Sequence, residues 1–251
     1  MNVRLDLEFD GTAYFGWQYQ PNRPTIQGTL EKALSRLFGA RIGVTGVGRT
    51  DAGVSALSFT ANFHLPGGAL PRMPLSAIPP ALNQLLPDDI RVKRAVPAGD
   101  DFHARYDARS KLYRYTIAFG PTPVLRQHVW ELGYPVDTNL MVEGAKLFLG
   151  EHDFAPFCRL RRRIGDQGFV NVMRAAVRQR RSPITGARLL QVEFQADRFL
   201  YKMVRRMVGT LVDVGRGKFS LDDLRRAITV RPLVQFQTAP AAGLVLVRVY
   251  Y

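Results

Sequence analysis

Hydrophobic and charged residues alternate at the start of the chain, where Val3, Leu5, Leu7 and Phe9 are separated by acidic or basic side chains. A two-residue period is typical of a β-strand with one face in the core and the other in water. The alternation recurs in residues 111–119. Further strands are predicted at residues 57–64, 170–181, 189–196 and 244–250.

A helical period follows the loop that contains Pro21 and Pro24. Apolar residues recur there every three or four positions, namely Leu30, Ala33, Leu34, Leu37 and Phe38. Thr25 is placed to cap the start of this helix, and Gly39 to end it. Further helices are predicted at residues 75–85, 139–149 and 200–214, and the pair Ser220 and Asp223 resembles a capping box that opens one more.

The order of these elements indicates an α+β fold, in which helices cover one face of a largely antiparallel sheet. We expect two similar halves, residues 1–108 and residues 109–251, joined around a long basic cleft, although no internal sequence repeat is evident. The Pro-rich passage at residues 66–97 is expected to run over the surface, as a lid or a linker.

Composition narrows the class of protein. The chain has 251 residues, of which 46% are hydrophobic and 22% charged, as in ordinary globular proteins. The alternating charges of the N-terminus exclude a signal peptide, and no stretch is apolar enough to span a membrane. A single cysteine, Cys158, provides neither a disulfide nor a thiolate cluster, which favours the cytoplasm.

The balance of charge indicates an acidic polymer as the partner. Thirty-five Lys and Arg against 21 Asp and Glu give a net charge of +14 and a pI of about 10.5. Residues 1–125 contribute 14 basic and 10 acidic side chains, a net +4, so residues 126–251 contribute 21 and 11, a net +10. The second half is therefore expected to bind most of the polymer.

The segment from Gly46 to Val54 places an Arg and an Asp two residues apart among three glycines. It lacks the third glycine of a dinucleotide-binding motif and the Gly-Lys-Ser/Thr of a phosphate-binding loop. The four histidines lie too far apart for a transition-metal site, and there is no serine nucleophile motif. Carboxylate chemistry at Asp51 remains, with an ordinary Asp/Gly turn as the alternative interpretation.

Two further residues have both a structural and a functional interpretation. Arg205 lies at the margin of the apolar stripe of helix 200–214, so it either extends to solvent or pairs with a carboxylate in a crevice. Tyr113 shares a strand face with other apolar residues but lies near the strand start, where it can line a cleft. A set of arginines is predicted to contact an RNA backbone: Arg161, Arg162, Arg163, Arg174, Arg178 and Arg180.

A series of short motifs then resembles the tRNA pseudouridine synthase A family, in family order across nearly the whole chain. In the N-terminal part these are Phe9-Asp10-Gly11-Thr12, Gly16-Trp17-Gln18, Thr25-Ile26-Gln27-Gly28, Gly48-Arg49-Thr50-Asp51-Ala52-Gly53-Val54 and Phe102-His103-Ala104-Arg105. Later come Tyr113-Arg114-Tyr115, His152-Asp153-Phe154, Phe199 to Arg205, Thr238-Ala239-Pro240 and Gly243-Leu244.

The resemblance implies a pseudouridine synthase fold and isomerisation of uridine to pseudouridine at positions 38, 39 and 40 of the tRNA anticodon stem-loop. It implies no cofactor and no metal. Asp51 matches the essential aspartate, which cleaves the glycosidic bond before the uracil turns and rejoins the ribose through C5. Either a covalent adduct or a glycal intermediate fits this role.

Four other positions take roles from the resemblance. Arg205 matches the cation that keeps Asp51 ionised, and Tyr113 matches the pocket tyrosine that stacks on uracil. Leu244 is expected beside the target base. Arg49 matches the residue that fills the space of a flipped base or holds the flipped nucleotide. The family also implies a homodimer that binds one tRNA across both subunits.

Two other classes of function remain open at this point. A non-catalytic RNA-binding protein would use Arg49 and Tyr113 only for stacking, with Asp51 as a turn residue. A hydrolase would use Asp51 as a base.

Overall fold

The computed structural model describes residues 1–65, 73–158, 168–229 and 236–251. They form two compact units, Met1–Arg109 with Val245–Tyr251, and Ser110–Leu244. The sequence predicts a division after residue 108 and a second half that runs to the C-terminus. In the structure, the C-terminal residues instead belong to the first unit, because the last strand pairs in parallel with a strand of that unit.

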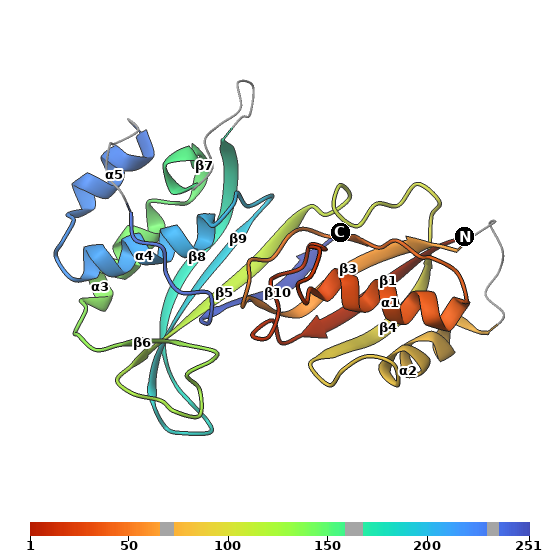
Figure 1. The fold of residues 1–251 in the computed structure, drawn as a ribbon. Coiled ribbons are helices and arrows are strands. Elements are labelled where there is room, and N and C mark those ends of the chain that lie inside the picture. Colours follow the sequence, from red (N-terminus) through yellow and green to blue (C-terminus); the bar gives the residue numbers. More distant parts are fainter. Residues whose placement is uncertain (66–72, 159–167, 230–235) are drawn as a thin grey trace. The chain divides into compact units, whose positions relative to one another are not determined.

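The sheet of the first unit has the order β4-β1-β3-β10 (Figure 1), with β2 paired to β3. The strands are β1 (Asn2–Phe9), β2 (Thr45–Gly46), β3 (Ser55–His64), β4 (Ile90–Ala98) and β10 (Leu244–Tyr250). The pairings among these five strands are antiparallel except that of β3 with β10. The helices are α1 (Ile26–Phe38) and α2 (Ile78–Asn83), the latter continuing the 3₁₀ turn η2 (Leu75–Ala77).

The core of the first unit lies between the sheet and its helices. Val3, Leu5 and Leu7 of β1 are fully buried, as their alternation predicts. Phe38 of α1 contacts Phe63 of β3 with ring centroids 5.8 Å apart. Burial of these apolar faces supplies the main free energy that holds helix and sheet together.

Strand β4 corrects the prediction that residues 66–97 run over the surface. Ile90 and Val92 are buried, and β4 pairs with β1 along its length. Pro97 lacks the N–H that a central strand needs, but β4 is the edge strand of its unit, where a missing donor is tolerated. Prolines favour loops, but the alternate buried residues Ile90 and Val92 have the two-residue period of a strand.

The sheet of the second unit has the order β5-β9-β8-β7, all antiparallel, and a short β6 pairs in parallel with β5. The strands are β5 (Ser110–Phe119), β6 (Trp130–Leu132), β7 (Gly150–Asp153), β8 (Phe169–Arg181) and β9 (Arg188–Ala196). The helices are α3 (Thr138–Lys146), α4 (Met203–Gly215) and α5 (Leu221–Thr229), with a 3₁₀ turn η3 (Ala155–Phe157). Strand β6 was not predicted.

The predicted helix ends are confirmed where a cap is local. The Thr25 hydroxyl accepts a hydrogen bond from the N–H of Gly28, and Gly39 ends α1 with φ +68°. At the start of α5, the side chains of Ser220 and Asp223 each accept a hydrogen bond from the other's N–H. Helix α4 begins later than predicted, because Lys202 has φ +61° and interrupts the helical backbone.

The predicted α+β class is therefore confirmed, with mostly antiparallel strand pairing in both units. Within the described ranges, no helix combines the length and the apolar character needed to cross a bilayer.

Candidate active site

Asp51 lies in the loop between β2 and β3, which packs against the segment that follows β1. The N–H of Trp17 donates to the carbonyl of Thr50 (3.3 Å), and the N–H of Gly53 donates to the carbonyl of Tyr14 (3.2 Å). Within the loop, the N–H of Val54 donates to the carbonyl of Asp51 (3.2 Å). Backbone hydrogen bonds on both sides thus hold the half-buried Asp51 in place.

Two glycines make this close approach possible. A Cβ on Gly11 would lie 2.0 Å from the carbonyl oxygen of Val54, and a Cβ on Gly16 would lie 2.4 Å from that of Thr50. Gly16 also has φ +87°, which disfavours any other residue. The Phe-Asp-Gly-Thr and Gly-Trp-Gln motifs therefore bring their glycines against the loop that carries Asp51.

Aromatic packing also supports the loop that carries Asp51. The Trp17 and Phe59 rings are stacked with centroids 4.2 Å apart, and Phe9 lies 5.4 Å from Phe59. A Cβ on Gly46 would meet the Trp17 ring at 2.5 Å, so this glycine lets β2 lie directly against the indole. The loop thus rests on a closely packed aromatic core, which limits its movement.

Arg49 is held by a chain of side-chain hydrogen bonds that ends on α1. Its Nε donates to Oε1 of Gln18 (3.1 Å), and Nε2 of Gln18 donates to Oε1 of Gln27 (2.9 Å). Nε2 of Gln27 donates in turn to Glu31 (3.0 Å) and to the carbonyl of Val44 (3.1 Å). We call Gln18, Gln27 and Glu31 the amide relay, and it fixes the guanidinium of Arg49 relative to α1.

Tyr113, Arg205 and Leu244 all lie in the second unit. Tyr113 is half-buried in β5 and makes an edge contact with the Phe199 ring at 5.0 Å. Arg205 is half-buried on α4, and its Nε donates to the carbonyl of Ala239 (2.8 Å). Leu244 is buried, and its N–H donates to the carbonyl of Ala241 (2.9 Å).

The segment from residue 237 to residue 244 contacts both α4, through Arg205, and β5. The hydroxyl of Tyr115 donates to the carbonyl of Pro240 (2.8 Å), and the N–H of Thr116 donates to that of Gly243 (2.8 Å). Burial raises the pKa of Tyr115 well above its usual value, while the charge of Arg205 acts in the opposite direction. Tyr115 therefore stays protonated and acts as a donor.

Comparison with known proteins decides the family. The sequence model described as tRNA pseudouridine synthase matches residues 7–107 and 145–251, which include Asp51, Arg49, Arg205 and Leu244. The chain belongs to the tRNA pseudouridine synthase A family. Its relatives span its full length, so the match covers both units.

Three relatives with the printed name tRNA pseudouridine synthase A illustrate the similarity. The protein of Acetivibrio thermocellus is 40% identical, and those of Caldicellulosiruptor bescii and Bacillus licheniformis are each 39% identical. Each alignment covers 100% of this chain and 99% of the relative. Two solved structures, an unknown protein from Galdieria sulphuraria and a Cas6 product complex, reach TM-scores of only 0.21 and 0.23 and carry no argument.

Membership confirms the resemblance found in the motifs and makes the chain a tRNA pseudouridine synthase, an isomerase. It argues against the two other classes that the residues left open, a purely RNA-binding protein and a hydrolase. The structure places Asp51 and Arg49 in the first unit and the other three predicted site residues in the second.

The predicted backbone-binding arginines differ in their surroundings. Arg161, Arg162 and Arg163 lie outside the described residues. Nη2 of Arg174 pairs with Glu193 (2.6 Å), whose other oxygen pairs with Arg114 (2.8 Å), so Arg174 is engaged within the fold. Arg178 and Arg180 are exposed, as the prediction requires.

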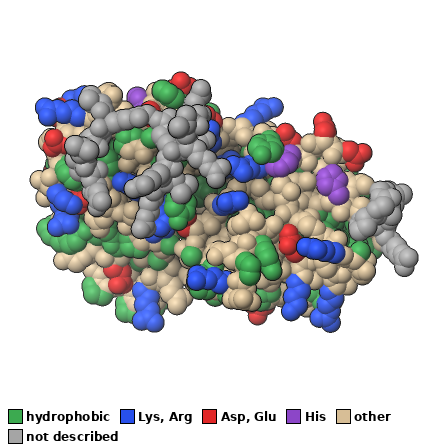
Figure 2. Space-filling view, turned by 45° about the horizontal axis from the view of Figure 1, so that its top comes forward, with side chains coloured by type: hydrophobic (Ala, Val, Ile, Leu, Met, Phe, Trp, Pro, Cys, Tyr) green, Lys and Arg blue, Asp and Glu red, His purple; other side chains and the backbone are tan. Residues whose placement is uncertain are grey.

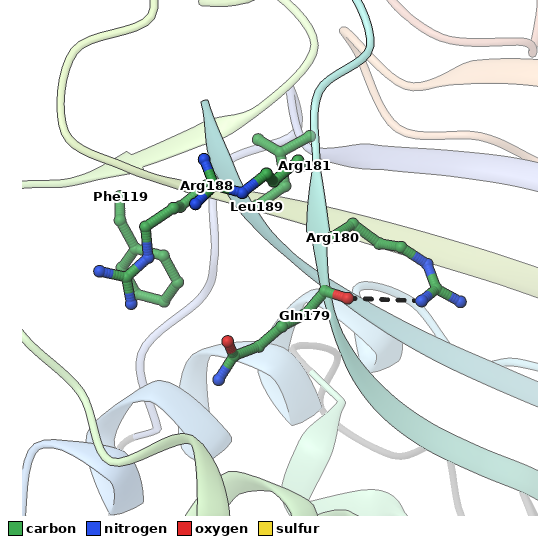
Figure 3. A pocket seen from close by; sticks show the side chains of 6 residues that line it. All are labelled: Phe119, Gln179, Arg180, Arg181, Arg188 and Leu189. Carbon is green, nitrogen blue, oxygen red and sulfur yellow. Dashed lines mark hydrogen bonds between the residues drawn. The ribbon is translucent and has the colours of Figure 1, made fainter. Parts of the chain in front are cut away.

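A basic hollow of about 410 Å³ lies where β8 ends and β9 begins (Figure 3). Arg181 and Arg188 face each other across the two strands, and the guanidinium of Arg188 lies 5.6 Å from the Phe119 ring centre. Arg180 extends away from them and donates to the carbonyl of Gln179 (3.4 Å). Basic side chains are also spread over the face drawn in Figure 2, as expected for a protein that binds a polyanion.

Several residues that line or support the site have a setting that no sequence pattern indicates. Gln18 and Gln27 belong to quoted motifs, Gly-Trp-Gln and Thr-Ile-Gln-Gly, but no role followed from the motifs alone. His103 belongs to another quoted motif and lies, with Arg49, on the wall of a cavity. The sequence offers as a signal only the place of these polar residues beside an apolar or aromatic residue in each motif.

Proposed function

We propose that this enzyme converts uridine to pseudouridine at positions 38, 39 and 40 of the tRNA anticodon stem-loop, with Asp51 as the catalytic residue. The observation that carries the proposal is the firmly anchored loop around Asp51, in a chain of this family. An anchored carboxylate acts on a nucleoside with little reorganisation, which lowers the barrier.

The reaction is a rearrangement within one nucleotide. The bond between uracil N1 and ribose C1′ breaks, the uracil rotates, and a bond between C5 and C1′ forms. The proton lost from C5 balances the proton gained at N1, so the product has the mass of the substrate. Asp51 assists departure of the uracil, through a covalent adduct at C1′ or through a glycal intermediate.

The proposal also assigns roles to three residues of the second unit. Arg205 takes the role that the family resemblance implies, that of the cation that partners the catalytic aspartate. Tyr113 stacks on the uracil and exchanges a proton with the sugar or the base. Leu244 packs beside the target base. The hydrogen bond from Arg205 to Ala239 supports this role, because it fixes the direction of the guanidinium.

A paired uridine must leave its helix before this chemistry begins. Base flipping costs a few kcal/mol of stacking and pairing. Arg49, directed by the amide relay, is proposed to occupy the space that the base leaves or to hold the flipped nucleotide. Phosphate contacts by exposed arginines, among them Arg178 and Arg180, offset the cost without reading sequence.

We also propose that the enzyme works in the cytoplasm as a homodimer, with one tRNA contacting both subunits. Sedimentation at the working concentration tests the dimer, and a monomer that retains full activity would contradict it.

The substitution Asp51→Asn tests the central proposal. We expect tRNA binding to stay within about threefold of wild type, since one carboxylate is replaced by an amide of the same size, while pseudouridine formation is lost. Nucleoside analysis of reacted tRNA detects the carbon-linked product, and primer extension after pseudouridine-specific derivatisation locates it at positions 38 to 40. Turnover by the Asn variant, or a product at other positions only, would refute the assignment.

A further inference from the structure

A polar cavity of about 200 Å³ lies in the first unit, beside the loop that carries Asp51. Its wall includes Trp17, Gln18, Arg49, His103, Arg105 and Tyr106. At about 30 Å³ for each water molecule, it has room for several waters, or for one base or phosphate. The described side chains that line it include two arginines and no carboxylate, so the cavity favours an anionic ligand.

Tyr106 gives this cavity an exposed aromatic wall. Its side chain is 75% exposed, and its ring lies against the His103 ring with centroids 4.2 Å apart. The guanidinium of Arg105 lies 5.7 Å from the Tyr106 ring centre. Single exposed apolar residues are common, but an aromatic ring beside a cation at a polar cavity is the arrangement that binds unpaired nucleotides.

The turn that presents Tyr106 is held by its own hydrogen bonds. Nδ1 of His103 accepts from the N–H groups of Arg105 (3.1 Å) and Tyr106 (3.3 Å). The N–H of His103 donates to Asp107 (2.9 Å). A turn held in this way loses little backbone freedom when a base stacks on the Tyr106 ring.

Buried polar groups anchor the same turn to the sheet. Asn62, which is 3% exposed, accepts a hydrogen bond from the N–H of Ala104 (3.0 Å) and donates to Asn2 (3.0 Å). The hydroxyl of Tyr251 donates to the carbonyl of Ala104 (2.8 Å), and burial raises the pKa of Tyr251 to about 12. The turn that carries Tyr106 is therefore held both by hydrogen bonds within it and by hydrogen bonds to Asn62 and Tyr251.

We propose that this cavity is a nucleotide subsite for the RNA next to the target uridine, in which a base stacks on Tyr106 and Arg105 contacts the adjoining phosphate. The inference rests on the proposed function, because Arg49, which also lines the cavity, handles the flipped nucleotide. Stacking tolerates any base, which suits an enzyme that acts on several tRNAs.

Steady-state kinetics with tRNA test the subsite. Tyr106→Ala is expected to raise KM and the Kd for tRNA by about 5- to 100-fold, the range for loss of one stacked base, with little change in kcat. Tyr106→Phe keeps the ring and should behave as wild type. Phe169→Ala removes a half-exposed aromatic ring of β8 and serves as the matched control.

A scan with modified RNA identifies the stacked nucleotide. Transcripts each carry one abasic residue near the target uridine, and their Kd values are measured with wild type and with Tyr106→Ala. At one position, the abasic residue should weaken binding to wild type and have no further effect on the variant. The proposal is overturned if Tyr106→Ala binds all transcripts like wild type, or if every abasic residue weakens both proteins equally.

The two proposals fail separately. Absence of pseudouridine from tRNA treated with wild type would refute the proposed function, while the binding scan would still report on the subsite. Normal modification at positions 38 to 40 together with an unaffected Tyr106→Ala variant would refute the subsite alone.

Discussion

Single glycines decide where predicted site residues lie, because they mark places where two backbones touch. A Cβ on Gly209 of α4 would lie 2.1 Å from the carbonyl oxygen of Gln237. One helical turn earlier on α4, the carbonyl of Arg205 accepts a hydrogen bond from the N–H of Ala239 (3.0 Å). Nε of Arg205 donates to the carbonyl of Ala239 (2.8 Å). The close approach at Gly209 therefore allows Arg205 of α4 to reach Ala239 of the Thr238-Ala239-Pro240 motif.

At this scale, Gly209→Ala is predicted to destabilise the protein. Alanine gains about 1 kcal/mol of helix propensity, but overpacking against a backbone oxygen costs about 1–3 kcal/mol and displaces Arg205, so the clash wins. Urea unfolding and turnover of tRNA measure both effects. Gly133→Ala, where a Cβ meets no atom within 4 Å, is the control. Equal stability of the two variants would contradict the prediction.

Among the elements, α1 does more than cover the sheet. The N–H of Ile26 donates to the carbonyl of Gly16 (3.2 Å), and that of Gln27 donates to the carbonyl of Trp17 (3.0 Å). The first turn of the helix is thus joined to the segment that holds the Asp51 loop. Gln27 and Glu31 then extend this connection through the amide relay to Arg49.

The N-cap of α1 is therefore expected to contribute to stability. Thr25→Ala removes the acceptor for the Gly28 N–H at a buried position and should cost about 0.5–2 kcal/mol in the free energy of unfolding, while Thr25→Ser should keep most of it. Thr29→Ala, one turn further on, serves as the control because alanine has the higher helix propensity. Urea denaturation compares all three. A loss at Thr29 as large as that at Thr25 would count against the cap.

For the whole molecule, the net charge favours binding of tRNA, but the fold decides which arginines are exposed to it. The chain carries +14, yet Arg114 and Arg174 share the buried Glu193 and so serve the second sheet itself. Arg178 and Arg180 are exposed and have no ion pair among the described residues. Fewer basic side chains are therefore available to tRNA than the 35 that the sequence contains, and the fold decides which arginines these are.

This difference predicts a salt effect. Replacement of both Arg178 and Arg180 by glutamine should lower the slope of log Kd against log salt for tRNA by about 0.7–0.9 for each lost phosphate contact. Arg225→Gln removes an exposed arginine that pairs with Asp222 in α5, and it should change the slope little. Filter binding between low and moderate salt gives the slopes. A double variant with the wild-type slope would remove these two arginines from the RNA surface.

The amino-acid sequence by itself determined what depends on neighbours along the chain. Its periods of two and of three to four residues located β1, β5 and α1, and Thr25, Gly39, Ser220 and Asp223 marked the helix ends, because caps act within one turn. Its motifs also identified the family and singled out Asp51 as the catalytic candidate.

Only the tertiary structure decided which distant residues meet. Residues 90–98 became a strand despite Pro97 because β1 offered an edge, and Arg174 turned to Glu193 because β8 and β9 are neighbours. The amide relay joins Gln18 to Gln27 and Arg49, and the Tyr106 cavity joins two motifs about fifty residues apart. Such contacts arise from packing of backbones and from buried hydrogen bonds, which local sequence patterns do not encode.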